Sequence, residues 1–381
     1  MQLNMRIRKK TQPISLRRSI VILGLALACA LLLCVLPMQI GQAQTKPGQT
    51  QSSSASHKPV AALSPYIDVH THLDETNVGG SMQSAMESMP SENLAKIVFM
   101  PSPFTLADAK RFDVELLLSA AKKYPGKIAV LGGGGTLNPM IIEAARTGDA
   151  GPEVQKKFRE RAEAILAAGA VGFGEMAAEH FPSSTPYETA PPDHPLFLLL
   201  ADIAAQHDVP ISIHMEAVPQ DIDLPAPLKS PPNPPRLHAN IAAFERLLSH
   251  NPRAKIIWAH LGWDTTGYRT PELMRRLLEA HPNLFMEIKL DPLDPEKNAP
   301  LAEVTLLSFG LASGVSGQIK PEWLRLLTDF QDRFVIGSDQ HYPQGSGPQR
   351  WQAVVLLFNE LPPAVRQKIG TENSIRIYHL K

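Results

Sequence analysis

The stretch Ile67-Asp68-Val69-His70-Thr71-His72-Leu73 decides how the rest of the chain is interpreted. Its β-forming residues alternate with polar ones, and this period of two predicts a strand. His70 and His72 are two residues apart, so both side chains project from the same side of that strand. Near the strand's end they could hold one metal ion together, although two ordinary packed histidines would give the same pattern. Residues further along the chain bear on this choice.

The first 44 residues have the features of an export signal. Basic residues precede an uncharged apolar run from Ile20 to Pro37, and Gln42-Ala43-Gln44 follows as a cleavage region. An uncleaved membrane anchor is the alternative, because the run approaches the ~18 residues that span a bilayer. We expect a periplasmic or secreted protein that is not attached to the membrane once the signal is removed. Residues 45–63 have the composition of a disordered linker, and the folded domain should cover 64–381.

Composition excludes several classes of function. The 37 acidic and 37 basic residues balance, so no net field attracts nucleic acid. Aromatic residues make up only 6%, without the basic and aromatic stripe on which single strands stack. The two cysteines, Cys29 and Cys34, precede the expected domain, so its chemistry uses neither disulfides nor thiolates. The expected partner is a small-molecule substrate, and a homo-oligomer is compatible with the sequence.

Short apolar segments alternate with longer amphipathic ones from residue 64 onward. The expected strands are 66–73, 96–101, 128–133, 170–176, 211–217, 256–262, 284–290 and 334–339. The expected helices are 107–124, 153–168, 195–207, 238–250, 271–281, 321–331 and 349–369, with a less regular first crossover at 80–95. This alternation predicts a single α/β domain, a closed parallel (β/α)8 TIM barrel with its site at the C-terminal ends of the strands.

An open doubly wound sheet is the alternative to the barrel. Its usual signature, Gly-x-Gly-x-x-Gly opening a helix after the first strand, is absent. The glycines from Gly132 to Gly135 should instead end the third strand, where the backbone passes close to the site. We expect no helix to start there, which favours the barrel.

Several expected strands end on ionisable side chains. These are His70 and His72 on the first strand, Glu175 on the fourth, His214 on the fifth, His260 on the sixth and Asp339 on the eighth. One such residue is usually an ordinary polar group, but burying six at the same end of a barrel without a cation would be costly. Four imidazoles and two carboxylates suit zinc or a similar divalent ion.

With these residues assembled, the chain resembles the metal-dependent amidohydrolase superfamily, and within it the amidohydrolase-2 and TatD-like branches. The similarity covers about residues 64 to 380. It rests on the first-strand motif, on Gly-Phe-Gly-Glu ending at Glu175, on Gly-Ser-Asp ending at Asp339, and on the closing segment 372–378.

The resemblance implies a role for each ligand. His70 and His72 would bind the more buried ion with Asp339, and Glu175 would bridge to a second ion. That second, more exposed ion would be held by the two remaining histidines, His214 and His260. Asp339 would also accept the proton of the attacking water. In the mononuclear decarboxylases of this branch, the fourth-strand position is usually not an acid and the sixth-strand histidine acts on the substrate.

The sequence therefore favours an exported hydrolase that uses one or two divalent ions, with zinc expected, to attack a small ester, lactone or amide. Glu175 favours two ions over one. One alternative is a non-oxidative decarboxylase with a single ion on the same barrel. Another is an exported metal-binding protein without turnover.

Further polar residues follow the expected strands. Lys289, two after Glu287, could bind an anionic substrate group or pair with a nearby acid. Six others could line the pocket or support the ligands: Glu216, Glu179, His180, Trp263, Asp264 and His341. The segment Pro219–Leu237, with seven prolines, could form a lid, a surface brace or an oligomer contact.

Overall fold

The structure is a computed structural model that describes residues 64–108, 112–180, 188–226, 233–261, 264–291, 302–306, 315–344 and 350–381. The predicted export signal at 1–44, the linker at 45–63 and Trp263 lie outside these residues. Among the described helices, none is both long and apolar enough to cross a membrane.

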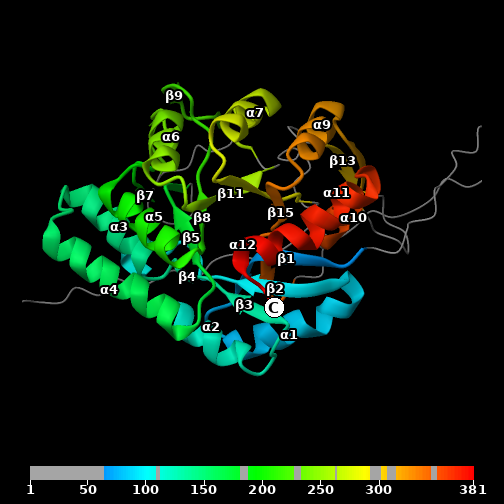
Figure 1. Ribbon diagram of the computed structural model, residues 1–381, viewed down its shortest axis with the longest axis horizontal. Coiled ribbons are helices and arrows are strands. Elements are labelled where there is room, and N and C mark those ends of the chain that lie inside the picture. The colour runs from blue at the N-terminus through cyan, green and yellow to red at the C-terminus, as the bar shows by residue number, and fades with distance from the viewer. Residues whose placement is uncertain are drawn as a thin grey trace, which may run out of the picture. The chain divides into compact units, whose positions relative to one another are not determined.

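Parallel strands form one nearly closed sheet at the centre of the described chain (Figure 1). Their spatial order is β3 (Ile128–Val130), β2 (Leu94–Phe99), β1 (Tyr66–Leu73), β15 (Phe334–Ile336), β12 (Leu284–Ile288), β11 (Lys255–Leu261), β8 (Pro210–His214), β5 (Phe173–Ala177) and β4 (Gly132–Gly133). Only Leu131 separates β3 from β4, and these two pieces pair with β2 and β5 respectively. They occupy one position in the ring, so the nine segments of this order fill eight positions; a tenth, β16 (Gln340–Tyr342), continues the position of β15 along β1, and the arrangement confirms the predicted TIM barrel.

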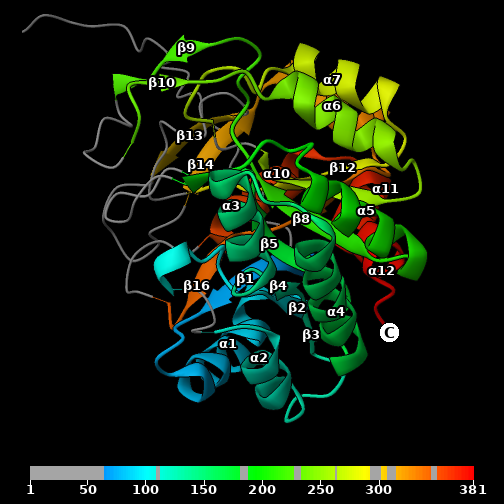
Figure 2. The same cartoon turned by 90° about the vertical axis from the view of Figure 1, so that its left-hand side faces the viewer.

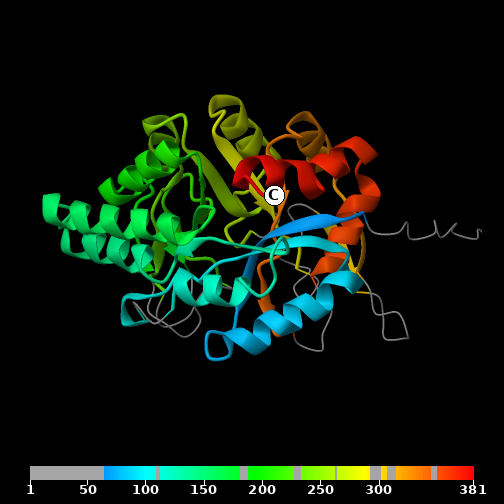
Figure 3. The same cartoon turned by 60° about the horizontal axis from the view of Figure 1, so that its bottom comes forward.

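Helices surround the strands in all three views (Figures 1, 2 and 3). They are α1 (Val78–Glu92), α2 (Val114–Ala121), α3 (Leu137–Thr147), α4 (Pro152–Ala168), α5 (Pro195–His207), α6 (Ile241–His250), α7 (Pro271–Ala280), α9 (Pro321–Asp329), α10 (Trp351–Glu360), α11 (Pro363–Gln367) and α12 (Asn373–Tyr378). The 3-10 turn η1 (Leu106–Asp108) precedes α2, and the π-helical turn η3 (Lys368–Glu372) precedes α12. Local sequence sets many of these boundaries: α4 begins at Pro152 and ends before Gly169, whose φ of +114° suits glycine.

The expectation that no helix follows the glycine run is wrong. α3 starts two residues after Gly135. Gly135 is itself required, because any side chain at this residue would collide with the backbone of Phe112. Gly133, with φ of +108°, helps the chain turn sharply from β4 into the helix. The expected helix 349–369 is also divided, because Leu361 precedes Pro362, is therefore disfavoured in helical backbone, and adopts an extended conformation after α10. The helix expected at 107–124 shortens to α2, which begins after Asp113 caps its first amide.

The core has two layers. The larger one packs the outer faces of the strands against the helices, with Trp258 of β11 against Phe244 of α6 as one contact. The smaller one joins side chains of several strands, including Ile67 and Val335, with Tyr378 of α12. Lys255, the first residue of β11, donates to the carbonyl of Ile377, which places α12 at the N-terminal ends of the strands. The opposite end of the barrel is therefore left for the site.

Small antiparallel hairpins follow three of the barrel strands. β6 (Glu179–His180) pairs with β7 (Glu188–Thr189). Figure 2 shows the other two hairpins, in which β9 (Ile222–Asp223) pairs with β10 (Arg236–Leu237) and β13 (Ala302–Leu306) with β14 (Val315–Ile319). β9 and β10 belong to the proline-rich segment 219–237, of which 227–232 lie outside the described residues. Val218, Leu224 and Leu237 form a separate small apolar cluster there. The lid function of this segment stays a prediction.

Candidate metal centre

The first two predicted ligands converge on one point. Nε2 of His70 and Nε2 of His72 are 3.1 Å apart, and both side chains are buried. The other ring nitrogen of His72 lies 3.0 Å from the carbonyl oxygen of Met100, and that of His70 lies 2.9 Å from Oε2 of Glu287. Because a carbonyl and a carboxylate only accept hydrogen bonds, both Nδ1 atoms carry a proton.

Glu175 presents one oxygen to each of two histidine pairs. Oε2 lies 3.4 Å from Nε2 of both His70 and His72. Oε1 lies 3.0 Å from Nδ1 of His214 and 3.0 Å from Nε2 of His260, and these two nitrogens are 3.1 Å apart. The carboxylate thus stands between two histidine pairs, and with each pair it forms a set of three donor atoms.

Close backbone packing positions Glu175. Its amide donates to the carbonyl of Pro101 at 3.0 Å. A Cβ at Gly134 would meet carbonyl oxygens of Pro101, Ser102 and Glu175 at 2.5 to 3.0 Å. The glycine therefore permits three strand ends to approach each other, as the sequence predicted for the glycine run.

Asp339, three residues after the end of β15, completes the first donor set. Its Oδ1 lies 3.1 Å from Nε2 of His72 and 3.8 Å from Nε2 of His70. Its Oδ2 pairs with Nζ of the fully buried Lys289 at 2.7 Å, with Arg350 3.9 Å away. Of the two roles predicted for Lys289, pairing with a nearby acid is therefore the one observed.

Two of the predicted ligands adopt a left-handed backbone that non-glycine residues rarely use. His260 has φ of +64° and Asp339 has φ of +54°. The carbonyls of Ala259 and His260 both accept from the guanidinium of buried Arg269. The amide of Asp339 donates to the carbonyl of His70 at 2.8 Å. Such strained residues persist where surrounding contacts hold them, commonly at functional sites.

The donor sets fit a divalent cation. With both Nδ1 atoms protonated, the Nε2 atoms of His70 and His72 face each other across 3.1 Å, and a positive charge between them, either a metal ion or a proton, relieves the repulsion of their lone pairs. Two ligands about 2.1 Å from one zinc ion would be about 3.0 to 3.4 Å apart for angles between 90° and the tetrahedral value. All the donor-atom distances that involve a histidine within both sets have this spacing except that between Asp339 and His70, which is 3.8 Å. Imidazole and carboxylate donors are the chemistry that zinc and similar ions take.

Charges in the cluster also favour a cation. Burial disfavours a charged imidazole, but the carboxylates of Glu287 and Glu175 outweigh it and raise the pKa of His70 well above its usual range. Burial alone would raise the pKa of Glu175, yet His70 and His214 hold that pKa well below its usual range. Burial likewise opposes ionisation of Asp339, while Lys289 and His72 keep its pKa low. The carboxylates of Glu175 and Asp339 are thus ionised and attract positive charge.

Sequence reasoning did not place Glu287 in the site. It is fully buried on β12, where its carboxylate is hydrogen-bonded to Nδ1 of His70 at 2.9 Å and lies 3.6 Å from Nδ1 of His260, a charge contact longer than a hydrogen bond. A single charged residue inside the apolar strand Leu284–Ile288 was the available signal. Arg350, which also pairs with Asp291 at 3.3 Å, was not predicted either.

The remaining predicted residues have other contacts. Asp264 accepts from the amides of Thr266, Gly267 and Arg269 and so caps a turn. Glu179 accepts from Asn240, and Glu216 lies 3.5 Å from the amide of Thr265. His341 stacks on His72 with ring centroids 4.7 Å apart and lies 3.9 Å from Asp339, so it borders the cluster. The side chain of His180 is outside the described part of the chain.

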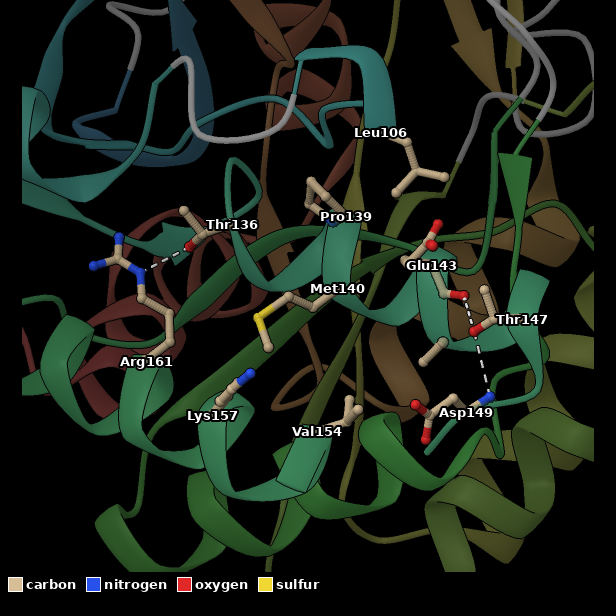
Figure 4. Close-up of a pocket in the computed structure, with 11 residues that line it drawn as sticks. Leu106, Thr136, Pro139, Met140, Glu143, Thr147, Asp149, Val154, Lys157 and Arg161 are labelled. Carbon is tan, nitrogen blue, oxygen red and sulfur yellow. Dashed lines mark hydrogen bonds between the residues drawn. The ribbon is translucent and has the colours of Figure 1, made fainter. Parts of the chain in front are cut away.

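A cavity of about 620 Å³ lies away from these ligands, between α3 and α4 (Figure 4). Its lining includes Met140 from α3 and Lys157 and Arg161 from α4. Arg161 is held by Thr136 and by Glu115, so its charge is already paired. None of the residues that line this cavity belongs to either donor set.

The chain is similar to several proteins of known structure. Among solved structures it is similar to 2,6-dihydroxybenzoate decarboxylase from Rhizobium, with 15% identity, a TM-score of 0.49, and coverage of 83% of this chain and 98% of that one. It is also similar to 4-oxalomesaconate hydratase from Rhodopseudomonas palustris, with 12% identity, a TM-score of 0.48, and coverage of 82% and 95%. A dihydroxybenzoic acid decarboxylase from Polaromonas sp. JS666, with bound manganese, shows 14% identity, a TM-score of 0.47, and coverage of 83% and 97%. No curated protein matched the sequence.

The model of one protein family, described as amidohydrolase (Amidohydro_2), matches residues 67–380. This match spans the whole barrel, from the first-strand histidines to the last helix. The chain therefore belongs to the amidohydrolase family.

Proposed function

We propose that the protein is an exported hydrolase that uses two divalent ions, with zinc as the expected metal, to activate water for attack on a small ester, lactone or amide. The observation that carries this proposal is the placement of Glu175. One of its oxygens faces His70 and His72, and the other faces His214 and His260. A carboxylate with one oxygen for each histidine pair suits two ions better than one.

The chain's own residues supply positioning and proton transfer. Bound divalent ions would lower the pKa of a water toward about 7 and polarise the substrate carbonyl. Asp339 Oδ1 faces the donor set and would take the proton from the attacking water, then give it to the leaving oxygen or nitrogen. Lys289 holds the other oxygen of Asp339, which fixes the direction in which the carboxylate accepts.

A decarboxylase with one ion is the second candidate, and the Lys289–Asp339 pair favours it. This pair keeps the pKa of Asp339 well below its usual range, which makes the carboxylate a weaker proton acceptor for water. Decarboxylation consumes no water: the carboxylate leaves as carbon dioxide and a proton takes its place on carbon. His260, rather than Asp339, would then act on the substrate.

A panel of esters, lactones, amides and aromatic carboxylic acids, assayed for acid release and for carbon dioxide, separates these candidates. We expect acid release by the wild type and its loss in Glu175→Gln, because a neutral amide bridges two cations poorly. Release of carbon dioxide without consumption of water would show that the protein is a lyase and not a hydrolase. A metal-loaded, folded protein without turnover on any compound would indicate a binding protein.

A further inference from the structure

A second carboxylate, that of Glu287, lies next to one histidine of each donor set, on the side of the ring that faces away from the donor atoms. Glu287 lies on the side of the histidines opposite to the converging donor atoms, with Oε2 2.9 Å from Nδ1 of His70 and Oε1 3.6 Å from Nδ1 of His260. His70 belongs to the first donor set and His260 to the second. Glu175 faces the donor atoms of both sets, and Glu287 faces the back of one histidine in each.

The fold makes room for this carboxylate. A Cβ at Gly337 would overlap Cγ and Cδ of Glu287 and come within 2.6 Å of Oε1. Gly337 is the residue directly after β15, and its amide donates to the carbonyl of Ile288 at 3.1 Å. Burying a carboxyl group in an apolar strand costs free energy of folding. Its presence here, in space that only a glycine at position 337 leaves open, indicates that the carboxylate has a specific function.

We propose that Glu287 is a positioning residue that couples the two ion sites: it accepts a hydrogen bond from Nδ1 of His70 at 2.9 Å, and its negative charge 3.6 Å from Nδ1 of His260 favours the tautomer with a proton on that nitrogen. Each Nε2 then presents its lone pair to the donor set, where Nε2 of His260 already lies 3.0 Å from Glu175. Partners of this kind typically change metal affinity by about 10- to 100-fold when removed. The inference rests on the proposed two-ion function and adds that the two sites lose affinity together.

Two substitutions at this position give different expected results. Glu287→Met removes both acceptor oxygens while keeping the volume, so both ions should bind about 10- to 100-fold more weakly. Glu287→Gln keeps one acceptor oxygen but presents an N–H to the second imidazole, where it disfavours a proton on Nδ1. This variant should therefore bind one ion as tightly as the wild type and the other more weakly. Glu92→Met is the matched control, because Glu92 is also buried but contacts Gln344 instead of a ligand histidine. It should leave both affinities unchanged.

The affinities are measured on the full chain by competition between zinc and a chelator, with circular dichroism to confirm folding. If Glu287→Met binds both ions as tightly as the wild type, or loses only one, the coupling is refuted. A wild type that binds no ion refutes the proposed function instead. Gly337→Ala should weaken both ions through displacement of the carboxylate, with Gly79→Ala, a position with free space around it, as its control.

Nitrogen-15 NMR of the unaltered, zinc-loaded protein tests the same proposal without any variant. His70 and His260 should both show a protonated Nδ1 and a metal-bound Nε2. A protonated Nε2 on either ring would overturn the inference.

Discussion

Replacing Lys289 with methionine should destabilise the metal-free protein more than the metal-loaded one. Lys289 is fully buried, and its Nζ lies 2.7 Å from Oδ2 of Asp339. At an effective dielectric constant of about 20, unit charges 2.7 Å apart attract each other by about 6 kcal/mol. Arg350, 3.9 Å from the same oxygen, retains part of this compensation. We therefore expect the free energy of unfolding of the metal-free protein to fall by about 3 to 5 kcal/mol.

Bound ions change this result because they neutralise the Asp339 carboxylate that the substitution leaves behind. In the zinc-loaded protein the loss should be less than half as large. Urea unfolding with chelator and with zinc measures both values. Lys368→Met is the matched control: this lysine pairs with Asp332 at 2.9 Å but in solvent, where the pair contributes at most about 1 kcal/mol. Equal losses for Lys289→Met in both states would refute the reasoning and make Lys289 a packing residue.

Three further outcomes are expected. Burial raises the pKa of Glu92 to about 7, above the unfolded value, so its stabilising contribution is present below about pH 4.5 and is lost as pH rises through 7. Glu92 alone should lower the free energy of unfolding by about 3 kcal/mol across that window, so the fall between pH 5 and 8 should be smaller by about this amount in Glu92→Gln than in the wild type. Urea unfolding at both pH values measures it, and an equal fall in the two proteins would contradict the prediction. His214→Ala should cost one ion and His70→Ala the other, as elemental analysis would reveal, whereas loss of both from His214→Ala would argue against two separable sites. N-terminal sequencing of the exported protein should find a start shortly after Gln42, and an intact Met1 in the membrane fraction would make residues 20–37 an anchor.

The barrel could be predicted because its signal is repeated along the chain. Each apolar strand is followed by a helical pattern, and parallel strands all end on the same side, so residues such as His70 and Asp339 could be brought together from their strand positions alone. Local signals also located the helix starts at Pro195 and Pro271 within a residue.

Other features depend on contacts between distant segments and leave little trace in a sequence. Glu287 resembles any single charge in an apolar strand until Gly337, 50 positions later, is seen to make room for it. The pairing of Lys289 with Asp339 instead of a substrate anion is a matter of distance across the barrel. The start of α3 was missed because glycines that usually end an element here form the turn that leads into the next one.

Metal content per chain is the measurement that tests the central claim most directly. The full chain, purified without chelator and saturated with zinc, should contain two ions per chain by elemental analysis. Glu175→Gln should contain one, because His70, His72 and Asp339 still hold the first ion. A wild type with one ion or none, or a Glu175→Gln variant that keeps two, would contradict the bridging role of Glu175.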